Sequence, residues 1–191
     1  PINPYGETKL IGEWMMADAE KAWGLRWAGL RYFNVAGAGW DDLGDMATLN
    51  LIPMVLDRLS KGETPKIFGT DYPTPDGTCV RDYIHVKDLA GAHIAALDYL
   101  AGGQDMAEHI FNVGTGQGAS VREVVSKVIA STGLDLEPEE LARRAGDPPQ
   151  LIGNATRIGE VLGWKAEHDL DDIVTSSYTS WQADPNRPHF G

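Results

Sequence analysis

The apolar residues of this chain follow two patterns, which predict two kinds of secondary structure. Recurrence every three or four positions predicts helices, which we place at residues 4–23, 49–61, 86–101, 120–131, 154–162 and 170–183. Short apolar runs predict strands at residues 25–33, 65–69, 79–86 and 109–113. The first of these runs is typical of a parallel strand buried in an α/β sheet. Ligands bind beyond the carboxyl ends of such strands, so we expect a site near Phe33 and Asn34.

Capping residues and glycines mark the ends of several predicted helices. Ser120, with Glu123 three residues later, is typical of a helix start. Gly24 and Gly62 lie where a helix is expected to end. Turn-forming residues predict three irregular segments. Residues 34–45 are expected to form a loop, residues 71–78 an exposed loop and residues 184–191 a C-terminal tail.

The first predicted helix carries a phenol and an ammonium group one turn apart. Asn3 is a suitable N-cap, and Pro4 suits the first helical position. Tyr5 and Lys9 are four residues apart and therefore project from the same face. The positive charge of Lys9 favours the phenolate form of Tyr5, which can then act as a general base. The same spacing also arises by chance on exposed helices, so the pair alone leaves both interpretations open.

The same helix has apolar residues on more than one face, which predicts two packing partners. We expect one partner to be a sheet of the same protein. The other is either a partner subunit or a further part of the same chain. The apolar residues concerned are Leu10, Ile11, Trp14, Met15, Ala19, Ala22 and Trp23.

Composition indicates a globular protein and excludes some partners. The chain has 191 residues, of which 42% are hydrophobic, and a formal net charge of −12. This charge argues against binding to nucleic acid or to an anionic membrane. An anionic nucleotide would have to be held by locally placed arginines. Cys79 is the single cysteine, so no internal disulfide can form, which fits a reducing cytoplasm. There is no apolar run of about 18 residues and no signal peptide.

The predicted strand at residues 79–86 supplies the best candidate for a phosphate ligand. Arg81 and Tyr83 share one face of this strand because side chains alternate. The planar guanidinium of Arg81 matches phosphate oxygens, although an ion pair with Asp82 or another acid is an alternative role. His85 has no second ligand at metal spacing, and we interpret it as structural.

Five sequence motifs follow one another along the chain in an order that matches a known family. They are Pro4-Tyr5-Gly6-x-Thr8-Lys9, residues 30–37 (LRYFNVAG), residues 80–90 (VRDYIHVKDLA), Phe111-Asn112-Val113-Gly114-x-Gly116 and Arg144-x-Gly146-Asp147-Pro148. Together they resemble the UDP-glucose 4-epimerases, which belong to the extended short-chain dehydrogenase/reductase family. The resemblance covers nearly the whole chain.

The resemblance implies an α/β fold in two parts. Residues 1–40 and 82–118 would be the C-terminal portion of an NAD-binding Rossmann fold, a doubly wound parallel sheet. Residues 41–81 and 119–191 would form a smaller mixed α/β domain that binds the nucleotide-sugar substrate. The family opens with a Gly-rich turn that binds pyrophosphate. Residues 114–118 contain three glycines at the wrong spacing and are expected to be a strand-to-helix loop. We therefore expect a C-terminal part of a longer epimerase.

The resemblance also implies roles for particular residues. Tyr5 and Lys9 would be catalytic, and together with Phe33 they would bind NAD. Phe68 would lie beside uracil. The full set of implied substrate-binding residues is Asn34, Asn50, Leu51, Phe68, Arg81, Tyr83, Arg144 and Asp147. No metal site is expected.

The implied activity is the NAD-dependent interconversion of UDP-galactose and UDP-glucose through a 4-keto sugar, in galactose metabolism. The resemblance further implies a homodimer that packs through the first helix, in the cytoplasm. We expect the 191 residues alone to be inactive. Leu151 lies near the position that sets the size of the sugar pocket, and N-acetylated sugars remain an open alternative. The alternative functions are another NAD-dependent nucleotide-sugar dehydratase or decarboxylase, and a non-catalytic remnant that binds a UDP-sugar.

Overall fold

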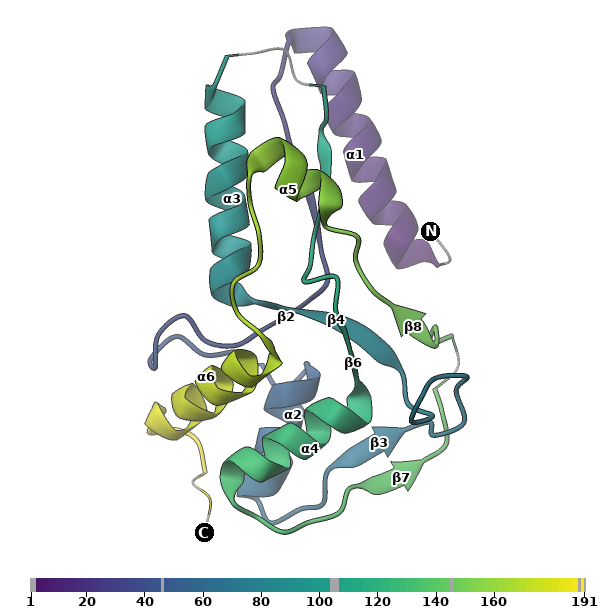
Figure 1. Cartoon of the computed structure of the whole chain (residues 1–191), viewed down its shortest axis with the longest axis vertical. Helices are drawn as coiled ribbons and strands as arrows, with labels where there is room; N and C mark the ends of the chain where they lie inside the picture. Colours follow the sequence, from purple (N-terminus) through teal and green to yellow (C-terminus); the bar gives the residue numbers. More distant parts are fainter. Residues whose placement is uncertain (1–2, 46, 104–106, 145, 189, 191) are drawn as a thin grey trace.

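A computed structural model describes residues 3–45, 47–103, 107–144, 146–188 and 190 of the chain (Figure 1). Six helices and eight strands follow one another along these residues. In chain order they are α1 (Pro4–Trp23), β1 (Gly29–Tyr32), β2 (Asn34–Ala36), α2 (Leu51–Ser60), β3 (Lys66–Phe68), β4 (Val80–His85), α3 (Val86–Ala101), β5 (Ile110–Val113), β6 (Gly118–Ser120), α4 (Val121–Thr132), β7 (Glu139–Leu141), β8 (Gln150–Leu151), α5 (Thr156–Leu162) and α6 (Leu170–Ala183).

The strands of the described residues form three small sheets in which most pairs are parallel. β1 pairs with β5, and β3 pairs with β7, both in parallel. β4 lies between its neighbours, parallel to β2 and β8 and antiparallel to β6. This register places Tyr83 opposite Asn34, and Arg81 opposite Leu151. Mainly parallel strands alternating with helices confirm the predicted α/β class.

Apolar side chains are buried in two clusters that lie toward opposite ends of the elongated molecule (Figure 1). Tyr83 and Ile84 are adjacent in β4 but belong to different clusters, because successive strand residues point in opposite directions. The first cluster comprises Ile84, Ala92, Phe111, Val113, Ile158 and Trp164. The second comprises Ile52, Val55, Leu56, Leu59, Ile67, Tyr83, Ala119, Val124, Val125, Val128, Ile129, Ile173, Val174 and Trp181.

Helix boundaries follow the capping residues that the sequence indicated. The Asn3 side chain accepts a hydrogen bond from the backbone N–H of Gly6 at 2.9 Å, which satisfies a free donor of the first turn of α1. The Ser120 hydroxyl likewise accepts from the N–H of Glu123 at 2.9 Å. Gly24 ends α1 with a φ of 68°, a left-handed conformation that favours glycine. These predicted boundaries are confirmed.

Three local predictions are wrong because tertiary contacts change the local outcome. Asn34 begins strand β2 rather than a loop, since it pairs with β4. Leu49 was expected on the buried side of a helix, but α2 begins at Leu51 and Leu49 is 85% exposed. The turn-rich segment before β4 is not wholly exposed, because Tyr72 and Thr78 are buried within it.

Two more expectations change in the same way. In α3, which the sequence predicts from apolar residues at helical spacing, Ala92 and Ala96 are buried, whereas Leu97 is exposed. The C-terminal segment is not a loose tail, because the indole N–H of Trp181 donates to the carbonyl of Pro188 at 3.3 Å.

Helix α1 lies along the outside of the molecule (Figure 1) and buries none of its residues. Its contacts with the rest of the chain are mainly polar. Arg31 donates to the Glu13 carboxylate at 2.6 Å, and the Trp27 indole donates to Glu20 at 3.2 Å. Trp14 remains exposed to solvent. The described residues therefore bury neither apolar face of α1, and the choice between the two predicted alternatives stays a prediction.

Two stacked histidines connect the end of β4 to the segment that precedes α6. His85, at the end of β4, stacks on His168 with ring centroids 4.4 Å apart. Its Nδ1 accepts from the N–H of Lys87 at 3.1 Å, and its Nε2 lies 3.0 Å from the hydroxyl of Ser176 in α6. His168 in turn lies 2.9 Å from the Asp88 carboxylate. The prediction that His85 is structural agrees with these contacts.

Burial lowers the pKa of His85 below its ordinary value of 6.5, and the neighbouring His168 and Lys87 lower the pKa further, against the opposing effects of Asp88 and Asp172. The folded chain therefore binds fewer protons at His85 than the unfolded chain does. The stabilisation that follows is complete above the unfolded pKa, and it is lost as the pH falls through and below that value.

We predict that the free energy of unfolding, measured with urea, falls between about pH 7.5 and about pH 5.5 because unfolding allows His85 to bind a proton. His85→Asn keeps an N-cap acceptor but has no imidazole to titrate, so its pH dependence should be flatter. His93→Asn, at an exposed histidine of α3, should keep the wild-type dependence. An equal slope in His85→Asn and the wild type would contradict the prediction.

Candidate functional site

Side chains from α2, β3, β4 and the loop before β8 line a pocket of about 250 Å3. Arg81 and Tyr83 both reach this pocket from β4, as expected for residues on one face of a strand. The residues that line it are Leu49, Leu51, Met54, Val55, Arg58, Lys66, Phe68, Cys79, Arg81, Tyr83, Val121, Arg144 and Asp147. The structure thus brings together six of the eight predicted substrate-binding residues.

Arg81 is held firmly at the wall of this pocket. Its guanidinium donates to the backbone carbonyl of Pro148 at 2.8 Å and lies 3.7 Å from the Asp147 carboxylate. The side chain is only 15% exposed. Of the two alternative ion pairs, the structure contains the one with another acid, Asp147, whereas Asp82 points to the other face of β4 and is held by other partners. The contacts with Pro148 and Asp147 fix the orientation of the Arg81 guanidinium group.

An aromatic ring and a second arginine lie together in the same pocket. The Arg144 guanidinium carbon is 4.0 Å from the centre of the Phe68 ring, a cation–π contact. Phe68 comes from β3 and Arg144 from the loop between β7 and β8, so they are 76 residues apart in sequence. A flat apolar ring beside a guanidinium is suited to a ligand that has both an aromatic base and phosphate groups.

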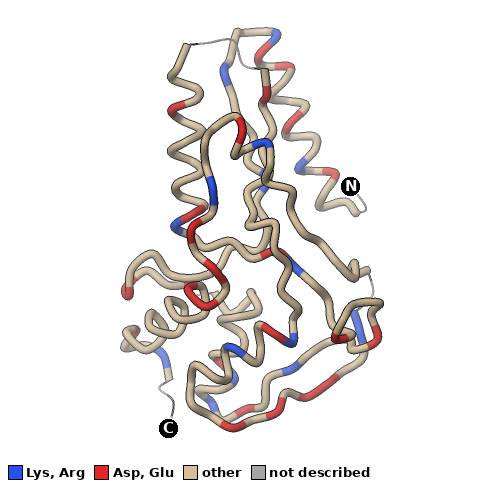
Figure 2. The backbone as a smooth tube through the Cα atoms, viewed as in Figure 1, with Lys and Arg blue, Asp and Glu red and all other residues tan. Residues whose placement is uncertain are grey.

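The pocket also contains two cations that sequence reasoning missed. Arg58 lies 3.2 Å from Glu63, and Lys66 lies 3.5 Å from Glu139. Acidic side chains are spread over most of the chain (Figure 2), whereas four of the residues that line this pocket are Lys or Arg and one is acidic. A signal was available for Lys66, because it is two residues before Phe68 in the same strand and therefore shares its face.

A second pocket of about 170 Å3 adjoins the first through the shared residues Leu49, Leu51 and Tyr83. It contains the two remaining predicted substrate-binding residues, Asn34 and Asn50. Its complete lining is Asn34, Val35, Ala36, Gly37, Asp45, Leu49, Asn50, Leu51, Ile52, Pro53, Tyr83 and Ser177. All eight predicted substrate-binding residues therefore lie in two adjoining pockets.

Tyr83 separates these pockets and remains a hydrogen-bond donor at neutral pH. Burial raises the pKa of its hydroxyl to about 12, although the charge of Arg81 acts in the opposite direction. The Asn50 side-chain amide, across the second pocket, donates to the Asp45 carboxylate at 2.7 Å. Asn50 also precedes α2 as its N-cap residue, where backbone N–H groups favour an anion.

Tyr5 and Lys9 lie close to each other but do not line these two pockets. The Lys9 ammonium is 5.0 Å from the centre of the Tyr5 ring, in agreement with the predicted i,i+4 proximity. Tyr5 is 72% exposed in the first turn of α1. Within the described residues, the structure assembles the pair but leaves it open to solvent.

Phe33, the third residue predicted to contact NAD, lies over two glycines. A Cβ atom added to Gly153 would be 2.4 Å from the Phe33 ring, and one added to Gly114 would be 3.1 Å from it. The loop that starts at Gly114 contacts Asp82 of β4, whose carboxylate accepts from the N–H groups of Thr115 and Gly116, each at 3.0 Å. These donors are therefore engaged within the chain. The predicted strand-to-helix loop is corrected in one respect, because Gly118 begins strand β6 and the loop connects β5 to β6.

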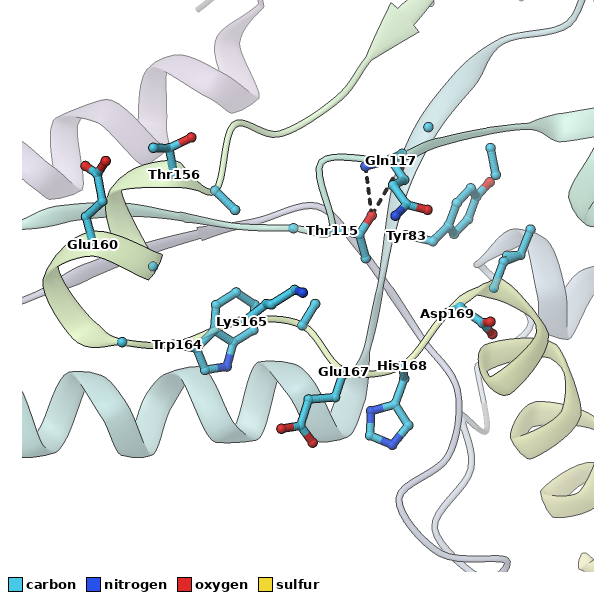
Figure 3. Close-up of a pocket in the computed structure, with 18 of the residues that line it drawn as sticks. Tyr83, Thr115, Gln117, Thr156, Glu160, Trp164, Lys165, Glu167, His168 and Asp169 are labelled. Carbon is cyan, nitrogen blue, oxygen red and sulfur yellow. Dashed lines mark hydrogen bonds between the residues drawn. The ribbon is translucent and has the colours of Figure 1, made fainter.

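A third cavity, of about 700 Å3, lies beside this loop (Figure 3). Thr115 and Gln117 border it on one side, and Trp164, Lys165 and the segment leading to α6 border it on the other (Figure 3). Its acidic residues are Glu123, Glu160, Glu167 and Asp169. Of the residues proposed from the sequence, Tyr83 alone is among those that line it.

Two kinds of feature are absent from the described residues. No group of three or more His, Cys, Asp or Glu side chains within them is arranged to hold a metal ion. None of the helices in the same part of the chain combines the length and the apolar character needed to cross a membrane.

Comparison with known proteins identifies the family. A family model described as "NAD dependent epimerase/dehydratase family" matches residues 1–114, more than half of the chain. The chain belongs to this family. Members of the epimerase/dehydratase family that resemble it include a UDP-glucose 4-epimerase of Azospirillum brasilense, 49% identical over 186 residues. This alignment covers 95% of the chain and 53% of the relative.

Solved structures of epimerases confirm the Rossmann-type fold class. UDP-glucose 4-epimerase from Brucella ovis in complex with NAD is 44% identical with a TM-score of 0.85, covering 93% of this chain and 56% of that one. The enzyme from Bifidobacterium longum in complex with NAD+ and UDP is 38% identical with a TM-score of 0.84, covering 97% and 56%. The resemblance to epimerases is thus confirmed, and the chain spans about half the length of the relatives that it matches.

The close contact between Phe33 and Gly153 gives a test of the packing in this family member. We predict that Gly153→Ala lowers the free energy of unfolding by about 1–3 kcal/mol, because the new methyl group would overlap the Phe33 ring. Gly39→Ala is a matched control, since no heavy atom lies within 4 Å of its added Cβ. Urea denaturation of both variants would measure the difference. Equal stability of the two variants would contradict the contact.

Proposed function

We propose that this chain is the part of a UDP-glucose 4-epimerase that binds the UDP-sugar, and that the whole enzyme interconverts UDP-galactose and UDP-glucose in galactose metabolism. One observation carries the proposal: the pocket at β3 and β4 combines an aromatic ring, Phe68, with Arg81, Arg144 and the carboxylate of Asp147. The relatives named UDP-glucose 4-epimerase, 49% identical or less, support the same function.

The chemistry of the pocket fits the parts of UDP. Phe68 and Leu51 offer apolar surface for the uracil, and Asp147 offers an acceptor for a ribose hydroxyl. Arg81 and Arg144 would hold the diphosphate, with Asn34 nearer the sugar. Binding energy from these contacts, remote from the sugar C4, would keep a 4-keto intermediate in the site.

We propose that Tyr5 and Lys9 are the catalytic couple. Tyr5 would remove and return the proton of the sugar 4-hydroxyl, and the charge of Lys9 would favour its phenolate form. Bound NAD would supply the hydride acceptor and donor for C4. Tyr5, Lys9 and Phe33 would contact its nicotinamide end. The loop at residues 114–117 is not suited to the NAD pyrophosphate, because Asp82 already occupies its N–H donors.

The division into domains remains part of this proposal. Residues 1–40 and 82–118 would be the Rossmann portion, and residues 41–81 and 119–191 the substrate domain. The two apolar clusters support such a division. Ile158 of α5, however, packs in the first cluster, so this helix would cover the Rossmann portion although it follows the substrate domain in sequence.

We further propose a homodimer of the intact enzyme in the cytoplasm. The dimer is supported by α1, which exposes Ile11, Trp14 and Met15 together with other apolar side chains. The cytoplasmic location is supported by the single cysteine, Cys79, which is buried and cannot form an internal disulfide.

One alternative is favoured by a specific observation. The exposure of Tyr5, outside the two nucleotide pockets, is what a non-catalytic chain that binds a UDP-sugar would also have. Leu151 is half exposed and leaves N-acetylated sugars as possible substrates. Product analysis with UDP- and dTDP-sugars would distinguish the epimerase from a dehydratase or decarboxylase of the same family.

We predict that the purified chain binds UDP in a calorimetric titration, and that Arg81→Ala weakens this binding roughly ten- to a hundredfold. The reason is the loss of charge-assisted hydrogen bonds to phosphate, worth about 1.5–3 kcal/mol. Arg157→Ala is the matched control, because Arg157 is an exposed arginine of α5 that pairs with Glu108 at 3.1 Å.

The same titration with NAD tests the division of binding sites. We expect no tight binding of NAD, since the pyrophosphate has no free donor loop at residues 114–117. Tight NAD binding without UDP binding would overturn the proposed substrate site. Rapid turnover of UDP-galactose by the chain with added NAD would contradict the expectation that these 191 residues are inactive alone.

A further inference from the structure

Asp82 is a fully buried carboxylate in the middle of β4, with 0% of its surface exposed. It accepts four hydrogen bonds. Oδ1 accepts from the N–H of Thr115 at 3.0 Å and from its hydroxyl at 2.7 Å. Oδ2 accepts from the N–H of Gly116 at 3.0 Å and from the N–H of Gly153 at 3.1 Å. Two separate segments of the chain therefore converge on one side chain.

These contacts form a closed site for a carboxylate. A buried charge is tolerated only where hydrogen bonds replace its water, and here three backbone N–H groups and a hydroxyl do so. The packing leaves no room for adjustment: a Cβ atom on Gly114 would lie 2.5 Å from Asp82 Oδ2. Among the described residues no ion pair to this carboxylate is present, so the three backbone N–H groups and the Thr115 hydroxyl compensate its charge.

The residues on either side of Asp82 face the nucleotide pocket. Arg81 and Tyr83 point away from Asp82 because strand side chains alternate, and both line the pocket. The hydrogen bonds of Asp82 therefore fix the position and orientation of Arg81 and Tyr83 relative to the pocket. The hydrogen bond from Gly153 also fixes the segment directly after β8, the strand whose Leu151 is opposite Arg81. Phe33 lies against Gly153 on the same side as Asp82.

We propose that Asp82 is a positioning residue for UDP-sugar binding: its carboxylate holds Arg81 and Tyr83 at the nucleotide pocket and couples them to Phe33 through the loops at Gly114 and Gly153. This proposal rests on the proposed function. A role confined to stability would lower the free energy of unfolding but leave the affinity of the folded chain for UDP unchanged.

The test compares two buried carboxylates. Asp82→Ala removes the anchor beside the pocket. Asp88→Ala is the matched control, because Asp88 is also buried and accepts hydrogen bonds from the His168 backbone N–H at 3.0 Å and its ring, but it lies outside both nucleotide pockets. Calorimetry with UDP at a temperature where both variants are folded should give at least a tenfold loss of affinity in Asp82→Ala and little change in Asp88→Ala.

Rescue by formate provides a second test. If Asp82 served stability alone, formate would not change the affinity of the folded variant for UDP. Asp82→Ala leaves four converging donors around a hole the size of a small carboxylate. Sodium formate should therefore restore UDP affinity in Asp82→Ala, whereas sodium chloride at the same ionic strength should not. Formate should leave the wild type and Asp88→Ala unchanged.

The outcomes separate this proposal from the proposed function. Wild-type chain that does not bind UDP overturns both. Wild-type binding that is equal in folded Asp82→Ala overturns the positioning role alone. If Asp82→Ala does not fold even in formate, Asp82→Asn replaces it, because the amide has the same size but turns a donor toward two of the N–H groups. A folded Asp82→Asn variant should lose affinity without response to formate. Wild-type affinity in that variant, or failure of both variants to fold, overturns the proposal.

Discussion

Strand β4 is the constraint on which the rest of the structure depends. It pairs with β2, β6 and β8, and its last four residues are all buried. A strand that is covered on both faces must bury every side chain, including polar ones, and each polar group then needs a partner. Asp82 finds its donors in the loop after β5 and at Gly153, and His85 finds its hydrogen-bond partners at Lys87 and Ser176. These contacts bring distant segments to fixed positions beside β4.

The nucleotide pocket is cationic in a chain of strongly negative charge, and its cations already have partners. Arg81 lies near Asp147, and Lys66 lies near Glu139. Ion pairs of this kind, at or near the surface, contribute little to stability, so under the proposed function a phosphate would replace the acid without a large loss. The pairing also prevents mutual repulsion of the cations when no ligand is bound. Charge neutralisation within the pocket and anion binding are therefore compatible.

Helix α1 differs from the other long helices because its contacts with the chain are polar and few. It is nevertheless capped at both ends, by Asn3 and Gly24, so its conformation depends on local interactions more than on burial. Tyr5 and Lys9 are brought together by this helix alone. Their distance from each other is set by helix geometry, which does not set their position relative to a sugar.

The sequence alone determined the interactions that span a few residues. Caps at Asn3 and Ser120, the proximity of Tyr5 to Lys9, and the shared face of Arg81 and Tyr83 all follow from helix and strand periodicity. Only the tertiary structure decided that Phe68 and Arg144 meet, that Leu49 is exposed, and that Asp82 is an anchor rather than a partner of Arg81. The partners of Asp82 lie 33, 34 and 71 residues away. Periodicity reports which side of an element a residue occupies, but the segment that covers that side is chosen by the packing of the whole chain.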